Sequence, residues 1–231
     1  SSLTSKDSKD KVIDTVATIT TDQIAAGAIV GSPTFVSATK TPGFKSTHTV
    51  SFKTAGRVLA AGKIVIVCPD MTTNQQTGWG FESPTASFST PNSGAPDATL
   101  VFNTRTLTVT TATNMMEQET SFVFALTNVR TPSSVVVIGA LDITTQDSGG
   151  LVTDTANDLA TDQIVRGNLV GLRKFESATD TPGFKSTASV SFTTAGQVQT
   201  GGEIVITMPD VAMTHSSIQA QWNFESPVIA F

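Results

Sequence analysis

The amino-acid sequence predicts an all-β fold made of tandem β-sandwich units, of which the second is incomplete. Three observations support this prediction. Short apolar runs alternate with polar residues at a period of two, Gly and Pro separate these runs at regular intervals, and one long stretch of sequence occurs twice. Helical periodicity is scarce, and only residues 114–118 fit a single helical turn.

The duplicated stretch extends over most of the chain. Residues 21–70 and 161–210 agree at about three positions in five, at a constant spacing of 140 residues. The same spacing relates the N-terminus to a later segment, because Leu3 falls opposite Ile143. This extent of identity predicts that both copies share one fold.

We therefore expect an N-terminal strand segment at residues 1–20, a first β-sandwich repeat at 21–160 and a partial second repeat at 161–231. After residue 210 the spacing grows, which places Phe231 opposite Phe88 and leaves the second copy without a counterpart of residues 89–140. Two explanations remain open. Either the chain is a window cut from a longer array, or the missing strands come from a neighbouring molecule.

The strands can be placed in chain order. Val50 and Phe52 alternate with polar residues, as a half-buried strand requires, and residues 64–67 form a β-branched run typical of a central strand. Further strands are expected at 100–103, 106–111, 121–126 and 135–138, and the second copy repeats the first two at 190–192 and 204–206. Pro42-Gly43 suits a type II turn. About eight or nine strands per repeat favour the immunoglobulin-like type of sandwich.

Composition excludes several classes of function. Only 14% of the residues are charged and the net charge is -5, so we expect no nucleic-acid partner. The sequence has no apolar run near the roughly 20 residues that a membrane-spanning helix needs, so we expect no membrane span. The single cysteine, Cys68, falls opposite Met208 and is expected to be a small core residue rather than a nucleophile.

The sequence predicts neither an enzyme nor a cofactor. His48 falls opposite Ala188 and His215 lies in a variable loop, so neither histidine recurs in a catalytic or metal-binding pattern. Glu82 and Glu225 follow aromatic residues but nothing marks them as a catalytic pair. An acidic stretch at Asp154, Asp158 and Asp162 leaves two interpretations open, a calcium site at the junction between copies or solvated linker carboxylates.

Aromatic residues also leave two interpretations open. Trp79 and Phe81 alternate onto one face, as do Trp222 and Phe224. Such a pair either closes a sandwich core or forms a stacking platform for sugar rings. Scarce aromatic residues and the absence of Tyr favour the core.

Ser/Thr/Ala-Pro dipeptides are candidate sites of O-linked or hydroxyproline-linked glycosylation, or else ordinary turn chemistry. The candidates are Ser32, Pro33, Thr41, Pro42, Thr90, Pro91, Pro96, Thr131, Pro132, Thr181 and Pro182. The chain contains no Asn-x-Ser/Thr acceptor, so any sugar is expected to be O-linked.

The sequence motif at residues 190–196, together with residues 201–209, resembles β-sandwich repeats in large surface and secreted proteins of algae and other microbial eukaryotes. Residues 50–69 carry the same motif in the first copy. Such repeats are similar to the tandem immunoglobulin-like units of extracellular, sometimes glycan-coated, fibrils. The resemblance implies an extracellular or cell-surface location and a structural role.

We therefore expect a homopolymer, an extracellular filament whose subunits join head to tail by β-strand complementation. The expected donor is the segment Lys11 to Ile24, and the expected subunit interface comprises Val12, Ile13, Val16, Ile19 and Phe231. Each chain contains one copy of residues 89–140 but two copies of residues 1–88. A neighbouring molecule can therefore donate only strands that do not already belong to its own sandwich. The alternative is a carbohydrate-binding adhesin module that uses Trp79 or Trp222.

Overall fold

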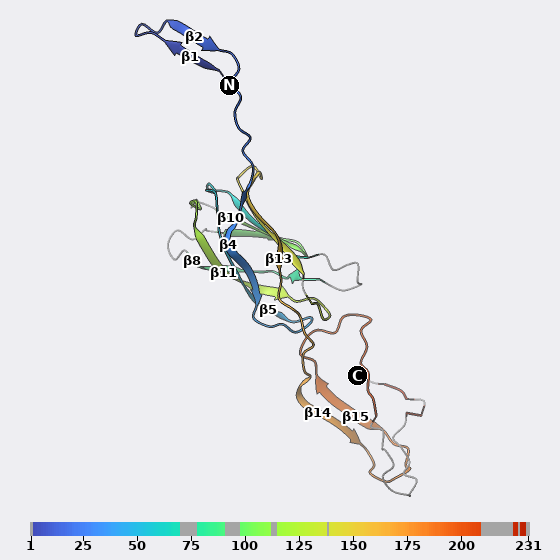
Figure 1. The fold of residues 1–231 in the computed structure, drawn as a ribbon. Helices are drawn as coiled ribbons and strands as arrows, with labels where there is room; N and C mark the ends of the chain where they lie inside the picture. The colour runs from blue at the N-terminus through green and yellow to red at the C-terminus, as the bar shows by residue number, and fades with distance from the viewer. Residues whose placement is uncertain are drawn as a thin grey trace.

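A computed structural model describes residues 2–69, 78–90, 98–111, 115–137, 139–208, 224–225 and 227–229. Within these ranges every regular element is a β-strand, which confirms the prediction of an all-β fold. Along the chain follow an N-terminal hairpin, a body of two large sheets and a second hairpin (Figure 1). The described residues contain no helix of the length and apolarity that crossing a membrane requires.

The N-terminal hairpin consists of β1 (Leu3–Lys6) and β2 (Val12–Val16). Asp7 shapes its turn, because one carboxylate oxygen accepts hydrogen bonds from the backbone N–H groups of Lys9 and Lys11 at 2.9 and 2.8 Å. Residues 17–26 form no strand and connect this hairpin to the body (Figure 1).

Two sheets make up the body. The first has six strands in the order β3 (Gly27–Ala28), β13 (Val152–Ala160), β12 (Ala140–Gln146), β6 (Lys63–Val67), β10 (Thr106–Thr111) and β9 (Ala98–Phe102). The second has the order β4 (Val30–Ser37), β5 (Lys45–Lys53), β11 (Ser121–Arg130) and β7 (Gly80–Phe81), with β8 (Ala86–Thr90) also paired to β11. All ladders of the body are antiparallel except the short one between β3 and β13.

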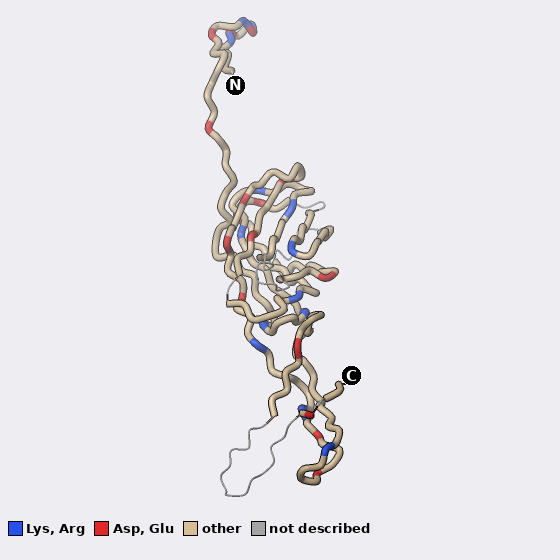
Figure 2. Tube along the Cα trace, turned by 90° about the vertical axis from the view of Figure 1, so that its right-hand side faces the viewer, with Lys and Arg blue, Asp and Glu red and all other residues tan. Residues whose placement is uncertain are grey.

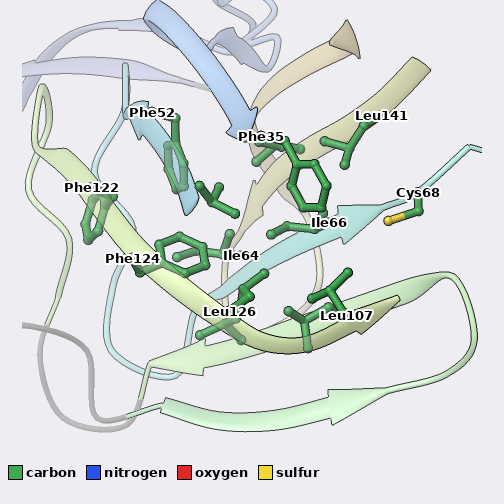
Figure 3. Packing of buried hydrophobic residues seen from close by; sticks show 14 of the residues in the cluster. Phe35, Phe52, Ile64, Ile66, Cys68, Leu107, Phe122, Phe124, Leu126 and Leu141 are labelled. Atoms are coloured by element: carbon green, nitrogen blue, oxygen red, sulfur yellow. The ribbon is translucent and has the colours of Figure 1, made fainter. Parts of the chain in front are cut away.

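The two sheets share one hydrophobic core (Figure 3). Burial alternates along β6, where Ile64 and Ile66 are fully buried while Val65 between them is not. Phe122, Phe124 and Leu126 of β11 lie on one face and are buried, as their spacing predicts. The period of two in the sequence therefore identifies the face of each strand that supplies the core.

Two predicted elements of the body differ in the structure. Residues 135–138 do not form a strand in their described part, because only Val136 makes a bridge, to Ile164. Met116 lies outside any helix and exchanges backbone hydrogen bonds with Val58 at 2.7 and 2.8 Å. In both places a long-range backbone partner replaces the local structure that the sequence favours.

Residues 161–164, which the repeat assigns to the second unit, pack against the first. The Thr161 hydroxyl accepts a hydrogen bond from the Gly139 N–H at 3.0 Å, and Ile164 is fully buried. The body therefore extends from residue 27 to residue 164. Beyond it, β14 (Val170–Ser177) and β15 (Ala188–Thr193) form the second hairpin.

A buried cluster of Phe35, His48 and Trp79 fills the space beside β4 and β5. The ring centroids lie 5.0 to 5.6 Å apart, and His48 and Trp79 are both fully buried. Neither ring nitrogen of His48 makes a hydrogen bond of good geometry among the described residues, although the Ser46 backbone lies nearby. Burial lowers the pKa of His48 from 6.5 to about 4, although the Ser46 backbone and the charge of Asp162 act in the opposite direction.

We predict that His48→Leu leaves stability equal or higher at pH 7, because it removes two buried polar atoms that make no hydrogen bond of good geometry. Between pH 6.5 and 4 the histidine is protonated in the unfolded chain but neutral in the folded one. As the pH falls through this range, the free energy of unfolding of the wild type therefore decreases by up to about 1.4 kcal/mol per pH unit. Urea unfolding at pH 7, 6 and 5 measures the difference. Identical pH slopes for wild type and variant would contradict the assignment.

Candidate assembly interface

The hairpin β1–β2 exposes apolar side chains. Leu3, Val12, Ile13 and Val16 are each more than half exposed, and the hairpin pairs only with itself among the described residues. A two-stranded hairpin alone is marginally stable in water. This element therefore gains stability from any surface that covers its apolar residues.

The hairpin β1–β2 has the same ladder as β12–β13 of the body. The partners Leu3–Val16, Thr4–Thr15 and Ser5–Asp14 correspond to Ile143–Ala156, Thr144–Thr155 and Thr145–Asp154. Both ladders shift register at the next residue. The Ser5 hydroxyl donates to the Asp14 carboxylate at 3.1 Å, and the Thr145 hydroxyl donates to Asp154 at the same distance.

In the body, β12 pairs with the central strand β6. Thr144 lies opposite Val65, Gln146 opposite Lys63, and the fully buried Ile143 opposite Ile66. The hairpin β12–β13 thus supplies both hydrogen bonds to β6 and a side chain to the core.

Asp154 connects the hairpin β12–β13 to the loop that follows β5. The carboxylate is fully buried, and its second oxygen accepts a hydrogen bond from the Gly56 N–H at 2.9 Å. A Cβ atom at Gly27 would lie only 2.7 Å from the same oxygen, so glycine is required there. In the exposed hairpin, Asp14 bonds Ser5, which corresponds to Thr145, and no described backbone N–H takes the place of Gly56.

The second half of the chain contains the complementary feature. Strands β14–β15 pair in the register of β4–β5, with Phe175 opposite Val190 as Phe35 lies opposite Val50. Residues 203–207, which correspond to β6, form no ladder with any described residue. The strand predicted at 204–206 is therefore not formed, because these residues have the sequence of a central strand but pair with no strand in the described part of the chain.

A groove of about 700 Å³ lies between β14–β15 and residues 203–208. Apolar lining comes from Phe175, Val190, Phe192, Ile204, Ile206 and Met208. Ile204 and Ile206 are 48% and 38% exposed, whereas their counterparts Ile64 and Ile66 are fully buried. In the body, the counterparts of these lining residues share one core cluster with side chains of β10, β11 and β12.

An ion pair fixes the segment that follows β13. Lys40 Nζ lies 2.7 Å from Asp162, and the Ser37 N–H donates to the same carboxylate at 2.6 Å. Burial alone would raise the pKa of Asp162, but the Lys40 ammonium and the Ser37 N–H hold it below its ordinary value. This carboxylate therefore holds the end of the body against β4.

The predicted interface residues fall into two groups. Val16 and Ile19 correspond to Ala156 and Leu159, which pack against the core cluster. Val12 corresponds to Val152, which stays 45% exposed in the body. Ile13 corresponds to Thr153, which is partly exposed, and Phe231 lies outside the described residues.

The predicted interface omits Leu3, because its residues were chosen for their apolar character within the segment Lys11 to Ile24. Its counterpart Ile143 is fully buried against β6, and the alignment of Leu3 with Ile143 already carried this signal. In the structure the segment expected to be the donor forms one strand of a hairpin, because β2 pairs with β1.

The glycosylation candidates differ in accessibility. Ser32, Thr181 and Pro182 are exposed, and Pro33, Thr41, Pro42 and Thr90 are partly exposed. Thr131 and Pro132 are buried, and the Thr131 hydroxyl bonds the Thr41 and Phe44 backbone, so the folded chain offers no access there. Pro91 and Pro96 lie outside the described residues.

The remaining candidates have structural partners. Trp79 and Phe81 are buried in the core, so Trp79 presents no platform for a sugar; Trp222 lies outside the described residues. Glu82 pairs with Arg130, which lowers the pKa of its carboxyl. Cys68 is buried in the core. Among the described residues no three acidic, His or Cys side chains are placed to share a metal ion.

Comparison with protein-family models finds no match, and comparison with curated proteins finds no significant relative. The functional argument therefore depends on the geometry of the chain itself.

We predict that Asp154→Ala lowers the free energy of unfolding by about 2–4 kcal/mol, because the Gly56 N–H and the Thr145 hydroxyl lose their buried acceptor. Chemical denaturation measures this loss. Glu117→Ala, which removes an exposed carboxylate of the same body, serves as the control and should change stability by less than about 0.5 kcal/mol. Equal effects of both substitutions would contradict the role of Asp154.

Proposed function

We propose that the chain is a structural subunit of an extracellular filament, assembled head to tail by β-strand complementation between copies. The observation that carries this proposal is the identical ladder of β1–β2 and β12–β13, one copy exposed and the other buried against β6. One end of each chain presents a hairpin, and the other presents an open groove beside residues 203–207.

The geometry favours open-ended assembly. The two surfaces differ and lie on opposite sides of the body (Figure 1), so each chain can engage one neighbour through each surface. Such heterologous contacts generate filaments unless the rotation closes a ring. An exposed apolar groove with unpaired backbone is also a state that proteins rarely leave uncovered.

The body is proposed to be a unit of the immunoglobulin-like type within a tandem array. Its support is the pair of predominantly antiparallel sheets around one core and the shared register of β4–β5 and β14–β15. Acidic and basic residues both lie along the trace (Figure 2). The exposed Ser32 and Thr181 are the accessible positions proposed for O-linked sugars on the filament surface.

Two substitutions separate donor from acceptor. Leu3→Asp places a carboxylate at the position whose counterpart in the body, Ile143, is buried. This variant should therefore accept a neighbour's hairpin in its groove but not donate its own hairpin. Ile206→Asp places a carboxylate in the apolar lining of the groove. That variant should therefore donate its hairpin but not accept a neighbour's hairpin. Val101→Asp, at an exposed apolar residue of β9, serves as the matched control.

We predict that the wild type and the Val101→Asp control form polydisperse oligomers at tens of micromolar or above, whereas each interface variant alone stays monomeric. An equimolar mixture of the two interface variants should form a 1:1 dimer and nothing larger. Analytical ultracentrifugation measures all of these states, and electron microscopy of the wild type tests for filaments. A monomeric wild type, or interface variants that still polymerise alone, would refute the proposal.

A further inference from the structure

We propose that the hairpin of one chain docks on residues 203–207 of a second copy in the register of β12 on β6, and that two charge contacts tune this contact in opposite directions. The inference rests on the proposed function and adds the partner residues. In this register Leu3 lies opposite Ile206, Thr4 opposite Val205, Ser5 opposite Ile204 and Lys6 opposite Glu203.

The apolar part of the contact follows from the body. Ile143 is fully buried beside Ile66, so Leu3 enters the groove beside Ile206. Val16, the partner of Leu3 in the hairpin, enters on the same side. One docking event thereby buries Leu3 and Val16 against the β12 side of residues 203–207.

The first charge contact is attractive. Gln146 lies opposite Lys63 in the body, and the corresponding pair between copies is Lys6 with Glu203. Within the described part of the chain Lys6 pairs with the exposed Asp10, at 2.9 Å, and an exposed pair of this kind can exchange partners. Opposite charges directly across a ladder stabilise the pair.

The second charge contact is repulsive. The body joins Asp162 to Lys40, and the corresponding residues between copies are Asp22 and Asp180. His48, whose ring lies near Asp162, is replaced by Ala188. The Ser177 N–H, counterpart of the Ser37 N–H, is then the remaining favourable partner of Asp22. This contact limits the affinity between copies.

A turn of the body already occupies part of the acceptor. Cβ atoms at Gly167 and Gly196 would lie 2.5 Å from Thr41 Cγ2 and 1.9 Å from the Pro42 carbonyl oxygen. The corresponding glycines of the body, Gly27 and Gly56, surround the Asp154 carboxylate. Docking of Asp14 therefore displaces this turn from the two glycines.

The test measures the affinity between a donor-only chain carrying Ile206→Asp and an acceptor-only chain carrying Leu3→Asp, by isothermal titration calorimetry at low salt. Glu203→Lys on the acceptor should weaken binding about 3- to 10-fold, and Lys6→Glu on the donor should restore it. Asp180→Lys on the acceptor should tighten binding about 3- to 10-fold, because it restores the pairing that Lys40 makes with Asp162. Added salt should diminish all three effects.

Lys9→Glu on the donor serves as the control, because Lys9 lies in the hairpin turn, and it should not rescue Glu203→Lys. Failure of the parent pair to bind would refute the proposed function itself. Binding that is unaffected by Asp180→Lys and shows no coupling between Lys6 and Glu203 would leave strand complementation standing and overturn this register.

Discussion

Pairing between a two-stranded hairpin and the central strand β6 is the interaction on which the body depends. It brings Ile143 into the core, gives β6 its backbone partners on one side, and places the Asp154 carboxylate where Gly56 and Thr145 hydrogen bond to it. Burial of these polar groups is tolerated because each finds a partner. The hairpin β1–β2 has the same ladder as β12–β13 but is exposed, and this second copy is the basis of the proposed assembly.

The two surfaces of the proposed contact differ in how much backbone pairing they contain. The hairpin β1–β2 contains its ladder, its turn and the Ser5–Asp14 hydrogen bond, and the proposed docking would add apolar contacts to this marginally stable element. Residues 203–207, in contrast, have apolar side chains around a groove but no ladder. In strand addition to a sheet edge, new main-chain hydrogen bonds give the affinity, and the proposed docking would form such bonds along residues 203–207.

Much of the fold could be predicted from sequence, because a period of two identifies strands and their buried faces, as in Phe122, Phe124 and Leu126. The repeat aligned Leu3 with Ile143, but only the structure shows that β1 and β2 are joined and that Ile143 is buried on β6. Val136 and Met116 were misassigned since their backbone partners, Ile164 and Val58, are remote in sequence. Local patterns carry no information on such pairings.

Disulfide trapping tests the account most directly. Thr4→Cys and Val205→Cys in one chain place thiols at positions that the proposed register pairs between copies, at a spacing a disulfide can bridge. Native Cys68 does not interfere, because burial raises the pKa of its thiol to about 12. We predict a reducible ladder of dimers, trimers and longer species, and little cross-linking when Thr207→Cys replaces Val205→Cys. Equal cross-linking of both pairs, or of neither, would contradict the account.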